Sequence, residues 1–248
     1  MDRLENLKNI IMYLMADNHV SHRIPSTLEE RQRMMRALMN VWEPRLIAED
    51  FLTMQDAELL MQREDKGVVE VHDEGLTIWQ GDITRLKVDA IVNAANAQAL
   101  GCWAPLHNCI DNCIHSAAGI QLRKECADKM QGRLLATGDA FITQGYNLPA
   151  RHVIHTVGPI IPDGIPTKEQ EEQLAQCYRS CLDLAEQNGL ESIAFCCIST
   201  GVFHFPNELA ARIAIETVKS YPRHALKTIV FNVFLDKDRD IYQQLLGA

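Results

Sequence analysis

A short, mostly apolar run from Val88 to Val92 constrains the fold of this chain most, because the polar sequence Asn93-Ala-Ala-Asn96 follows it directly. Apolar runs of about four to eight residues that end in turn-forming residues are typical of buried strands. A weaker strand pattern at 76–79 ends in the turn pair Gly81-Asp82. Polar loops at strand ends hold ligands in α/β proteins, because the sheet gives them a rigid floor. We expect a ligand site here, although ordinary turns use the same residue types.

Strand-like and helix-like segments alternate along the rest of the chain. Strand patterns cover 138–145, 153–157, 192–198 and 227–235, and helical patterns cover 111–118, 121–130, 167–189, 207–220 and 241–246. In the long helix that Thr167 is expected to cap, Cys177 and Cys181 fall in an apolar stripe, which favours core thiols over ligands. His155 alternates with valines, which favours a structural histidine. The alternation predicts a three-layer α/β/α sandwich around a mixed sheet.

Residues 1–66 have a different, all-helical pattern. The apolar face of the first helix consists of Leu4, Leu7, Ile11 and Leu14. Ser26 with Glu29 predicts a capping box before the next helix, and Thr53 with Asp56 predicts another cap. The polar segment Glu64–Gly67 is the expected boundary between this extension (1–66) and a second domain (67–248). We expect the extension to pack against the sheet edge or to present a face to partners.

Two thiols and one imidazole lie close together at Cys102, His107 and Cys109. Such a set can close on one Zn²⁺ ion, which favours sulfur and nitrogen ligands in tetrahedral geometry. Three protein ligands would leave a fourth position for water or substrate, as in catalytic zinc sites. Cys113 and His115 are near enough to compete, although the helix expected at 111–118 would turn them away and favours a core thiol at Cys113. The alternative is a loop with two incidental thiols and a surface histidine.

The segment Ser199–Phe203 follows an apolar strand and precedes a helix. This geometry presents backbone N–H groups to phosphate, and Gly201 allows close approach of the backbone to a ligand. The lysine of a P-loop is missing, so ATP hydrolysis is not supported.

The net charge of the chain is −9 at pH 7, which argues against nonspecific binding to nucleic acid. Its eight cysteines show no regular disulfide framework, so we expect a reducing, cytoplasmic environment. The apolar run Ile10–Met15 is too short for a secretory signal, and no stretch predicts a membrane span.

Several motifs together resemble the macrodomain signature. They are Gly81-Asp-Ile-Thr84, Asn93-Ala-Ala-Asn96, Asp111-Asn-Cys-Ile-His-Ser-Ala-Ala-Gly119, Ile198-Ser-Thr-Gly-Val-Phe203 and Phe205-Pro206, and they follow in the order of that family. MacroD-type hydrolases of this family carry a run of glycines between the Asn-rich motif and the aspartate. Here a longer loop with Cys102, His107 and Cys109 replaces that run, which resembles the bacterial zinc-containing subclass that removes ADP-ribose from modified proteins. The resemblance implies one Zn²⁺ per chain at these residues.

The resemblance also implies how ADP-ribose would be bound. Asp82 would accept a hydrogen bond from the adenine amine, and the 199–203 loop would hold the diphosphate. Asn96 and Asp111, the candidate catalytic residues, would bracket the distal ribose, and Asn93 would support the loop. The full set expected to contact ADP-ribose is Asp82, Ile83, Asn93, Asn96, Cys109, Ile110, Asp111, Ser199, Thr200, Gly201, Val202, Phe203 and Phe234. Phe234 could equally be a core residue.

The activity implied by this resemblance is zinc-dependent hydrolysis of mono-ADP-ribose from acidic side chains of an ADP-ribosylated protein, with free ADP-ribose as product. Asp111 would orient or deprotonate the attacking water. The alternatives are a non-catalytic ADP-ribose-binding module, an O-acetyl-ADP-ribose deacetylase, and a structural zinc module whose N-terminal helices recruit a partner. We expect neither nucleic acid nor a membrane as partner.

Overall fold

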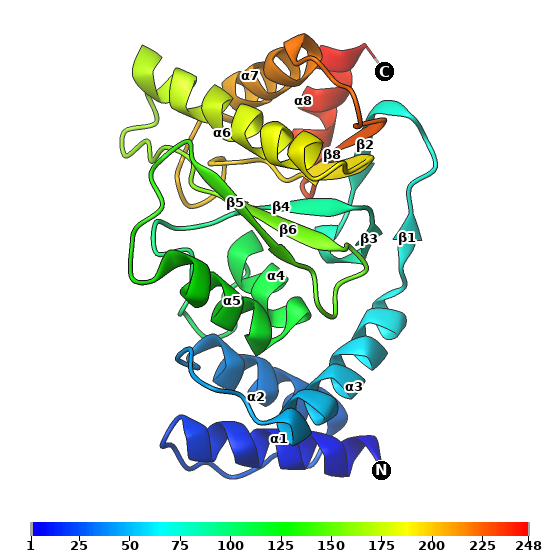
Figure 1. Cartoon of the computed structure of the whole chain (residues 1–248), viewed down its shortest axis with the longest axis vertical. Coiled ribbons are helices and arrows are strands. Elements are labelled where there is room, and N and C mark those ends of the chain that lie inside the picture. The colour runs from blue at the N-terminus through cyan, green and yellow to red at the C-terminus, as the bar shows by residue number, and fades with distance from the viewer. Residues whose placement is uncertain (1, 248) are drawn as a thin grey trace.

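The computed structural model describes residues 2–247 and consists of an α/β body with a helical unit beneath it (Figure 1). The helical unit contains α1 (Arg3–Asp17), α2 (Leu28–Asn40) and α3 (Glu49–Lys66). The strands of the body are β1 (Val69–Glu70), β2 (Gly75–Gln80), β3 (Leu86–Lys87), β4 (Ala90–Ala94), β5 (Ala140–Gln144), β6 (His152–Thr156), β7 (Ser192–Phe195) and β8 (Thr228–Val233). Its helices are the 3₁₀ turn η1 (Ile83–Arg85), α4 (Ile110–Ala118), α5 (Ile120–Met130), α6 (Lys168–Gln187), α7 (Asn207–Ser220) and α8 (Asp236–Leu246).

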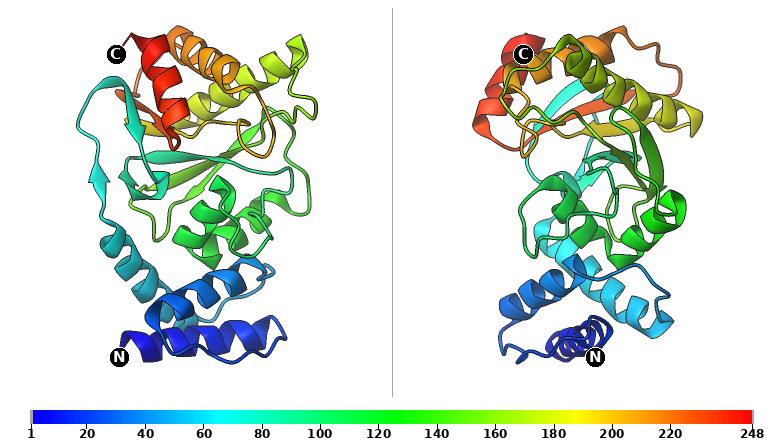
Figure 2. Two further views of the ribbon diagram at one scale, coloured as in Figure 1. Left: turned by 180° about the vertical axis from the view of Figure 1, so that it is seen from behind. Right: turned by 90° about the vertical axis from the view of Figure 1, so that its left-hand side faces the viewer.

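The main sheet has the strand order β2-β8-β7-β4-β6-β5. All of its pairs are parallel except β5–β6, so the sheet is mixed as predicted. Helices α4 and α5 cover one face, and α6, α7 and α8 cover the other (Figures 1 and 2). Burial on both faces explains why β8 is buried along its whole length. The predicted three-layer α/β/α sandwich is therefore confirmed.

The long helix α6 begins as the sequence predicts. The Thr167 side chain accepts from the backbone N–H of Gln170, and the Gln170 side chain accepts from the Thr167 N–H, which completes a capping box. Its stripe packs into the core, where Cys177 and Cys181 are fully buried. The prediction of core thiols at these two positions is confirmed.

The two predicted helix caps in the N-terminal region are wrong. Thr27, not Ser26, caps α2: it has extended backbone angles, and its Oγ1 accepts from the Glu30 N–H at 3.3 Å. Helix α3 already begins at Glu49, so Thr53 lies inside it and donates its hydroxyl to the Glu49 carbonyl oxygen. At α2 the adjacent hydroxyl offered an equivalent cap, whereas α3 begins after Ala48 with no side-chain cap.

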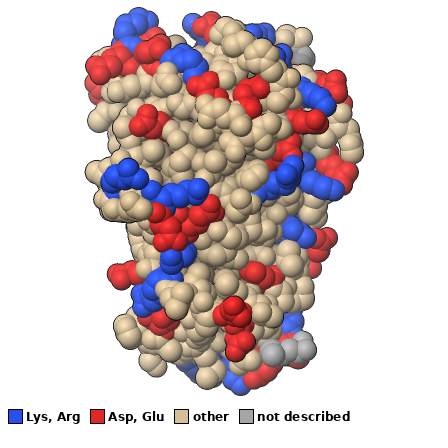
Figure 3. Space-filling view, viewed as in Figure 1, with Lys and Arg blue, Asp and Glu red and all other residues tan. Residues whose placement is uncertain are grey.

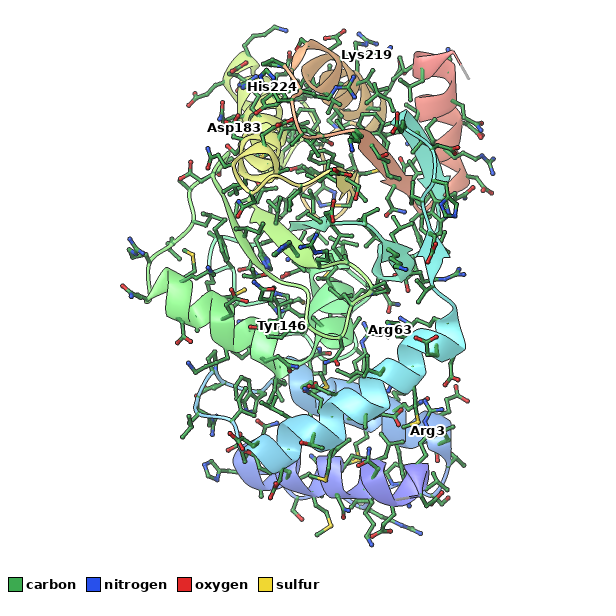
Figure 4. The ribbon with its side chains drawn as sticks, turned by 45° about the vertical axis from the view of Figure 1, so that its right-hand side comes forward. Arg3, Arg63, Tyr146, Asp183, Lys219 and His224 are labelled. Carbon is green, nitrogen blue, oxygen red and sulfur yellow. The ribbon has the colours of Figure 1, made fainter. Side chains whose placement is uncertain are left out.

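Helices α1–α3 share a hydrophobic cluster of their own. It consists of Leu7, Ile10, Ile11, Leu14, Met35, Leu38, Met39, Trp42, Phe51 and Leu59, together with Ile120 of α5. Arg3 ties α1 to α3 through Glu58 at 2.9 Å and Asp65 at 2.8 Å (Figure 4). The unit packs against the α4–α5 layer rather than against the sheet edge, which corrects the expected placement (Figure 2). A boundary between two domains after residue 66 stays a prediction. Across residues 2–247, no helix has the length and apolarity needed to cross a membrane.

Gln55 of α3 fastens the helical unit to the body. Its side chain is fully buried, its Oε1 accepts from the Ile120 N–H at 3.0 Å, and its Nε2 donates to Gln121 at 2.6 Å. Helix α5 has no cap from its own N-cap residue Gly119, so Gln55 satisfies a backbone donor that would otherwise be buried without a partner.

We therefore expect Gln55→Leu to lower the free energy of unfolding by about 1–3 kcal/mol, the cost of a buried group left without a hydrogen bond. Chemical denaturation measures this change. The exposed Gln243→Leu in α8 is the matched control and is expected to change stability by less than about 0.5 kcal/mol. Equal stability of the two variants would contradict the role of Gln55.

Candidate functional site

The predicted site residues gather at one edge of the sheet. Strands β2, β8, β7 and β4 run parallel, so their carboxyl ends meet at the same edge. Asp82 follows β2, Asn96 follows β4, Ser199 follows β7 and Phe234 follows β8. Parallel pairing thus brings together four segments that are far apart in the sequence.

Asp82 lies at one end of this edge as an ionised acceptor. Its Oδ1 accepts from the N–H and the hydroxyl of Thr84 at 3.0 and 2.6 Å, and its Oδ2 pairs with Lys66 Nζ at 3.2 Å. Burial raises the pKa of the Asp82 carboxyl, but Lys66 and Thr84 outweigh burial and leave that pKa below its ordinary value. The side chain of Ile83 is buried, which leaves only its backbone for a ligand.

Phe234 is 70% exposed beyond the end of β8. The alternative reading of this residue as a core phenylalanine is therefore wrong. Stacking of its ring on a base stays a prediction.

The segment after β7 forms a compact loop with an open row of donors. Ser199 and His204 have φ angles of 65° and 58°, and the Phe205 N–H closes the loop on the Ser199 carbonyl oxygen at 3.0 Å. Within residues 2–247, the N–H groups of Gly201, Val202 and Phe203 have no hydrogen-bond acceptor. Three successive free N–H groups in an exposed loop suit an anion.

Ser199 itself points inward. Its Oγ is buried and has no hydrogen-bond partner among the described residues. A Cβ atom at Gly158 would lie 1.9 Å from that oxygen, so the two loops touch and Gly158 must lack a side chain. Of Ser199, only the backbone is available to a ligand.

Asp111 lies at the other end of the edge, in the first turn of α4. It is 5% exposed, and its Oδ1 accepts from Asn93 Nδ2 at 2.8 Å. Asn96 approaches its Oδ2 at 3.4 Å and also accepts from the N–H groups of Gln98 and Ala99, which shapes the turn. Burial raises the pKa of the Asp111 carboxyl to about 6, although Asn93 and Arg123 oppose the rise.

Asn93 is fully buried beneath Asp111. Its Nδ2 also lies 3.1 Å from His155 Nδ1, so the amide joins β4 to β6 and α4. This position favours the supporting role expected for Asn93. Direct contact of Asn93 with a ligand stays a prediction.

The ligand atoms of Cys102, His107 and Cys109 all lie within 4.8 Å of one another in the loop before α4. Cys102 Sγ is 3.6 Å from His107 Nδ1. A thiolate and an imidazole bound to one tetrahedral Zn²⁺ would be about 3.6 Å apart, given Zn–S and Zn–N lengths of about 2.3 and 2.0–2.1 Å. The three residues therefore fit a zinc ion.

Cys109 also serves as the N-cap of α4, because its Sγ accepts from the Asn112 N–H at 3.4 Å. Burial is the main reason that the pKa of the Cys109 thiol rises to about 12, and Cys102 adds to the rise. Binding of a cation would remove this barrier to deprotonation, since metal ions bind the thiolate.

A second group, His115, Cys126 and His155, is buried behind Asp111. His155 accepts from Asn93 at its Nδ1, while its Nε2 lies 3.0 Å from Thr143 Oγ1, whose hydroxyl bonds to the Val153 carbonyl oxygen. The prediction of a satisfied structural histidine is confirmed. His115 Nε2 faces Asp111 Oδ1 at 3.5 Å. Burial lowers the pKa of both imidazoles, to about 3 for His155, so both rings are neutral beside Asp111.

The two expected competitors of the zinc ligands therefore lie elsewhere. His115 belongs to the group behind Asp111. Cys113 is only half-buried and lies 3.8 Å from Arg36 of α2, so it is not the core thiol that the helical pattern favoured. Sequence reasoning missed Arg36, Asn40 and Lys66, which reach the site from the helical unit. No local pattern identifies them.

The two cysteine-containing groups give different expectations for metal binding. Cys102→Ala is expected to lose bound zinc, because two ligands remain where three converged, whereas Cys126→Ala is expected to keep it. Metal analysis of purified protein after zinc loading measures both. Zinc retained by Cys102→Ala and lost by Cys126→Ala would reverse the assignment.

Comparisons with known proteins agree with this geometry. The family described as "Macro domain" matches residues 92–214. A "Protein-ADP-ribose hydrolase" of Staphylococcus aureus is 44% identical, with 98% of this chain and 97% of that protein covered. A protein of the same description from Treponema medium is 47% identical, with 96% and 97% covered.

Solved structures give the same result. A mutant Oceanobacillus iheyensis macrodomain with ADPR has a TM-score of 0.64 and 40% identity, and the match covers 71% of this chain and 94% of that one. The Trypanosoma brucei macrodomain in complex with ADP-ribose has a TM-score of 0.65 and 30% identity, with 86% and 95% covered.

Proposed function

This chain belongs to the Macro domain family, and from that membership we propose that it is a protein-ADP-ribose hydrolase that releases mono-ADP-ribose from a modified protein. The observation that carries the proposal is the pairing of the buried carboxylate of Asp111 with an anion-binding loop at the same sheet edge. Relatives with that name match this chain over nearly its full length.

In this proposal the nucleotide lies along the carboxyl ends of the strands. The adenine amine donates to Asp82, whose ionised carboxyl is an acceptor, and the Ile83 N–H binds beside it. The N–H groups of 201–203 receive the diphosphate, and the exposed ring of Phe234 is available to stack on adenine. Ser199 and Thr200 contribute to the shape of the loop through their bonds to Phe205 and Cys197.

The distal ribose lies at the N-terminus of α4. Asn96 and Asp111 bracket it, and Cys109 and Ile110 border it at the start of the helix. Asp111 accepts the proton of the attacking water, whose oxygen replaces the carboxylate of the modified side chain, so that the ester bond to the ribose breaks. Asn93 holds the Asp111 carboxyl in position for this transfer.

Cys102, His107 and Cys109 would hold one Zn²⁺ ion beside this ribose. When bound there, the ion supplies Lewis acidity, which lowers the pKa of a nearby water or hydroxyl group. Two thiolates neutralise its charge, so positioning of the ribose contributes as well as activation. A cytoplasmic location and the lack of nucleic-acid and membrane partners stay predictions from the sequence.

Release of ADP-ribose from a protein modified on acidic side chains tests this function. We expect turnover by the purified protein, loss of turnover in Asp111→Asn and in Cys102→Ala, and ADP-ribose affinity that stays within about tenfold in Cys102→Ala. The affinity is expected to stay because Cys102 lies in the loop with His107 and Cys109, whereas the proposed diphosphate site is the separate loop at 199–203. Calorimetry with ADP-ribose measures the affinity.

Four outcomes would contradict the proposal in different ways. Binding without any release would identify a non-catalytic ADP-ribose-binding module. Faster turnover of O-acetyl-ADP-ribose than of the modified protein would identify a deacetylase. Equal loss of binding and turnover in Cys102→Ala would show that the metal has a structural role. Full activity after removal of the metal with a chelator would show that the activity does not depend on zinc.

Gly158 offers a test of the diphosphate loop. A Cβ atom there would meet Ser199 Oγ at 1.9 Å and Ile198 Cγ2 at 2.9 Å, so Gly158→Ala is expected to displace the loop and weaken ADP-ribose binding at least about tenfold. Combination with Ser199→Gly removes the closer of the two contacts, and the φ of 65° at Ser199 suits glycine. The double variant is therefore expected to recover part of the affinity. Unchanged affinity in Gly158→Ala would show that the loop does not bind the diphosphate.

A further inference from the structure

The loop that contains Cys102, His107 and Cys109 is hydrogen-bonded to α2 of the N-terminal helical unit. We propose that Arg36 and Asn40 of α2 are positioning residues that set the metal affinity of this loop, so that the helical unit is part of the site. The inference rests on the metal site of the proposed function. It goes beyond that function because it assigns a role to helices outside the α/β body.

Arg36 holds the loop through its guanidinium group. Its Nη2 donates to the His107 carbonyl oxygen at 2.7 Å and to Asn112 Oδ1 at 2.9 Å, and its Nε donates to the same Oδ1 at 3.2 Å. The His107 backbone and Asn112, the third residue of α4, are thereby fixed relative to each other. Asn112 in turn donates its N–H to Cys109 Sγ and its Nδ2 to the Ala104 carbonyl oxygen.

Asn40 holds the residue before the histidine ligand. Its side chain is 1% exposed, and its Oδ1 accepts from the Leu106 N–H at 2.9 Å while its Nδ2 donates to Ser116 Oγ at 3.0 Å. Leu106 has a φ of 60°, a left-handed conformation that is unfavourable for a residue with a Cβ. The bond from Asn40 therefore stabilises an unfavourable backbone turn that points His107 toward the two thiols.

Arg123 of α5 connects the third ligand to the same helix. Its Nη1 donates to the carbonyl oxygens of Asn40 and Trp42 at 2.8 and 2.9 Å, and its Nη2 donates to the Cys102 carbonyl oxygen at 3.3 Å. Its guanidinium carbon also lies 4.1 Å from the centre of the Trp103 ring. Each of the three ligand residues is thus linked to α2 through at most one intervening side chain.

These bonds bear on metal affinity through the order of the loop. Ordering a flexible loop costs conformational entropy for each residue fixed, and a loop that is already fixed does not incur that cost when the metal binds. Loss of partners that orient metal ligands typically weakens metal binding about 10–100-fold. The guanidinium fork of Arg36 is suited to this task, since lysine would present a single ammonium group to the two acceptors.

Zinc affinity, measured by competition with a chromophoric chelator on the full chain, tests the proposal. Arg36→Leu and Asn40→Ala are each expected to bind Zn²⁺ about 10–100-fold more weakly than the wild type, and Arg36→Lys is expected to be intermediate. Arg33→Leu, which removes the same charge from an exposed position one turn earlier on α2, is the matched control and is expected to bind zinc like the wild type.

Two further measurements separate positioning from folding. The metal-free variants are expected to stay folded, with an unfolding temperature that falls only as far as the loss of these hydrogen bonds explains. Their ADP-ribose affinity is expected to stay close to the wild type, because the bonds concern the loop that contains Cys102, His107 and Cys109 and not the 199–203 loop. Where Arg36→Leu fails to fold, Arg36→Lys and Asn40→Ala supply the same comparison.

Wild-type zinc affinity in Arg36→Lys and Asn40→Ala would overturn the proposal and leave the proposed function standing. A wild-type protein that binds no zinc would overturn the positioning role together with the metal site, and the hydrolysis assay would then judge the activity separately. An equal loss of zinc affinity in Arg33→Leu would also overturn the proposal, because it would show an effect of charge rather than of position.

Discussion

The hydrogen bond between Asn93 Nδ2 and Asp111 Oδ1, 2.8 Å long and buried, is the interaction on which the rest of the site depends. It fastens the first turn of α4 to the end of β4, and α4 follows the loop that contains Cys102, His107 and Cys109. The same amide contacts His155 on β6, and His155 contacts Thr143 on β5, so the carboxylate is anchored across three strands. A carboxylate placed this deep is stable only with such partners, and Asn93 and Asn96 together fix how its two oxygens are oriented.

The proposed binding of an anionic diphosphate poses an electrostatic difficulty, because the chain has a net negative charge. The protein carries a formal charge of −9, and on the face in Figure 3 basic and acidic side chains are mixed rather than gathered by sign. In the proposed binding mode, backbone N–H groups at 201–203 would hold the diphosphate without added positive charge. Ser199, at the start of this loop, packs closely against Gly158.

Much of this arrangement could be predicted from the sequence, because it is local or periodic. The cap at Thr167, the stripe of α6 and the alternation of strands and helices follow from spacing, and the motifs around Asp82, Asn96 and Asp111 predict the site edge. Arg36, Asn40 and Lys66 could not be found in this way, since Arg36 and Asn112 are 76 positions apart and share no pattern. Phe234 was undecided because its exposure depends on where β8 ends, and Thr27 replaced Ser26 because adjacent hydroxyls are equivalent until the helix packs.

The pairing of β2 with β8 has a consequence for how the molecule is made. Trp79 of β2 and Asn232 of β8 lie side by side, although 153 positions separate them. During synthesis β2 leaves the ribosome early and has no neighbour in the main sheet until β8, the last strand, has emerged. The strand edge of β2 must therefore stay free of other partners while most of the chain is translated. Pairing between segments so far apart in the sequence also slows folding. The end of the sheet edge at Asp82, where we propose that adenine binds, is thus assembled among the last parts of the protein.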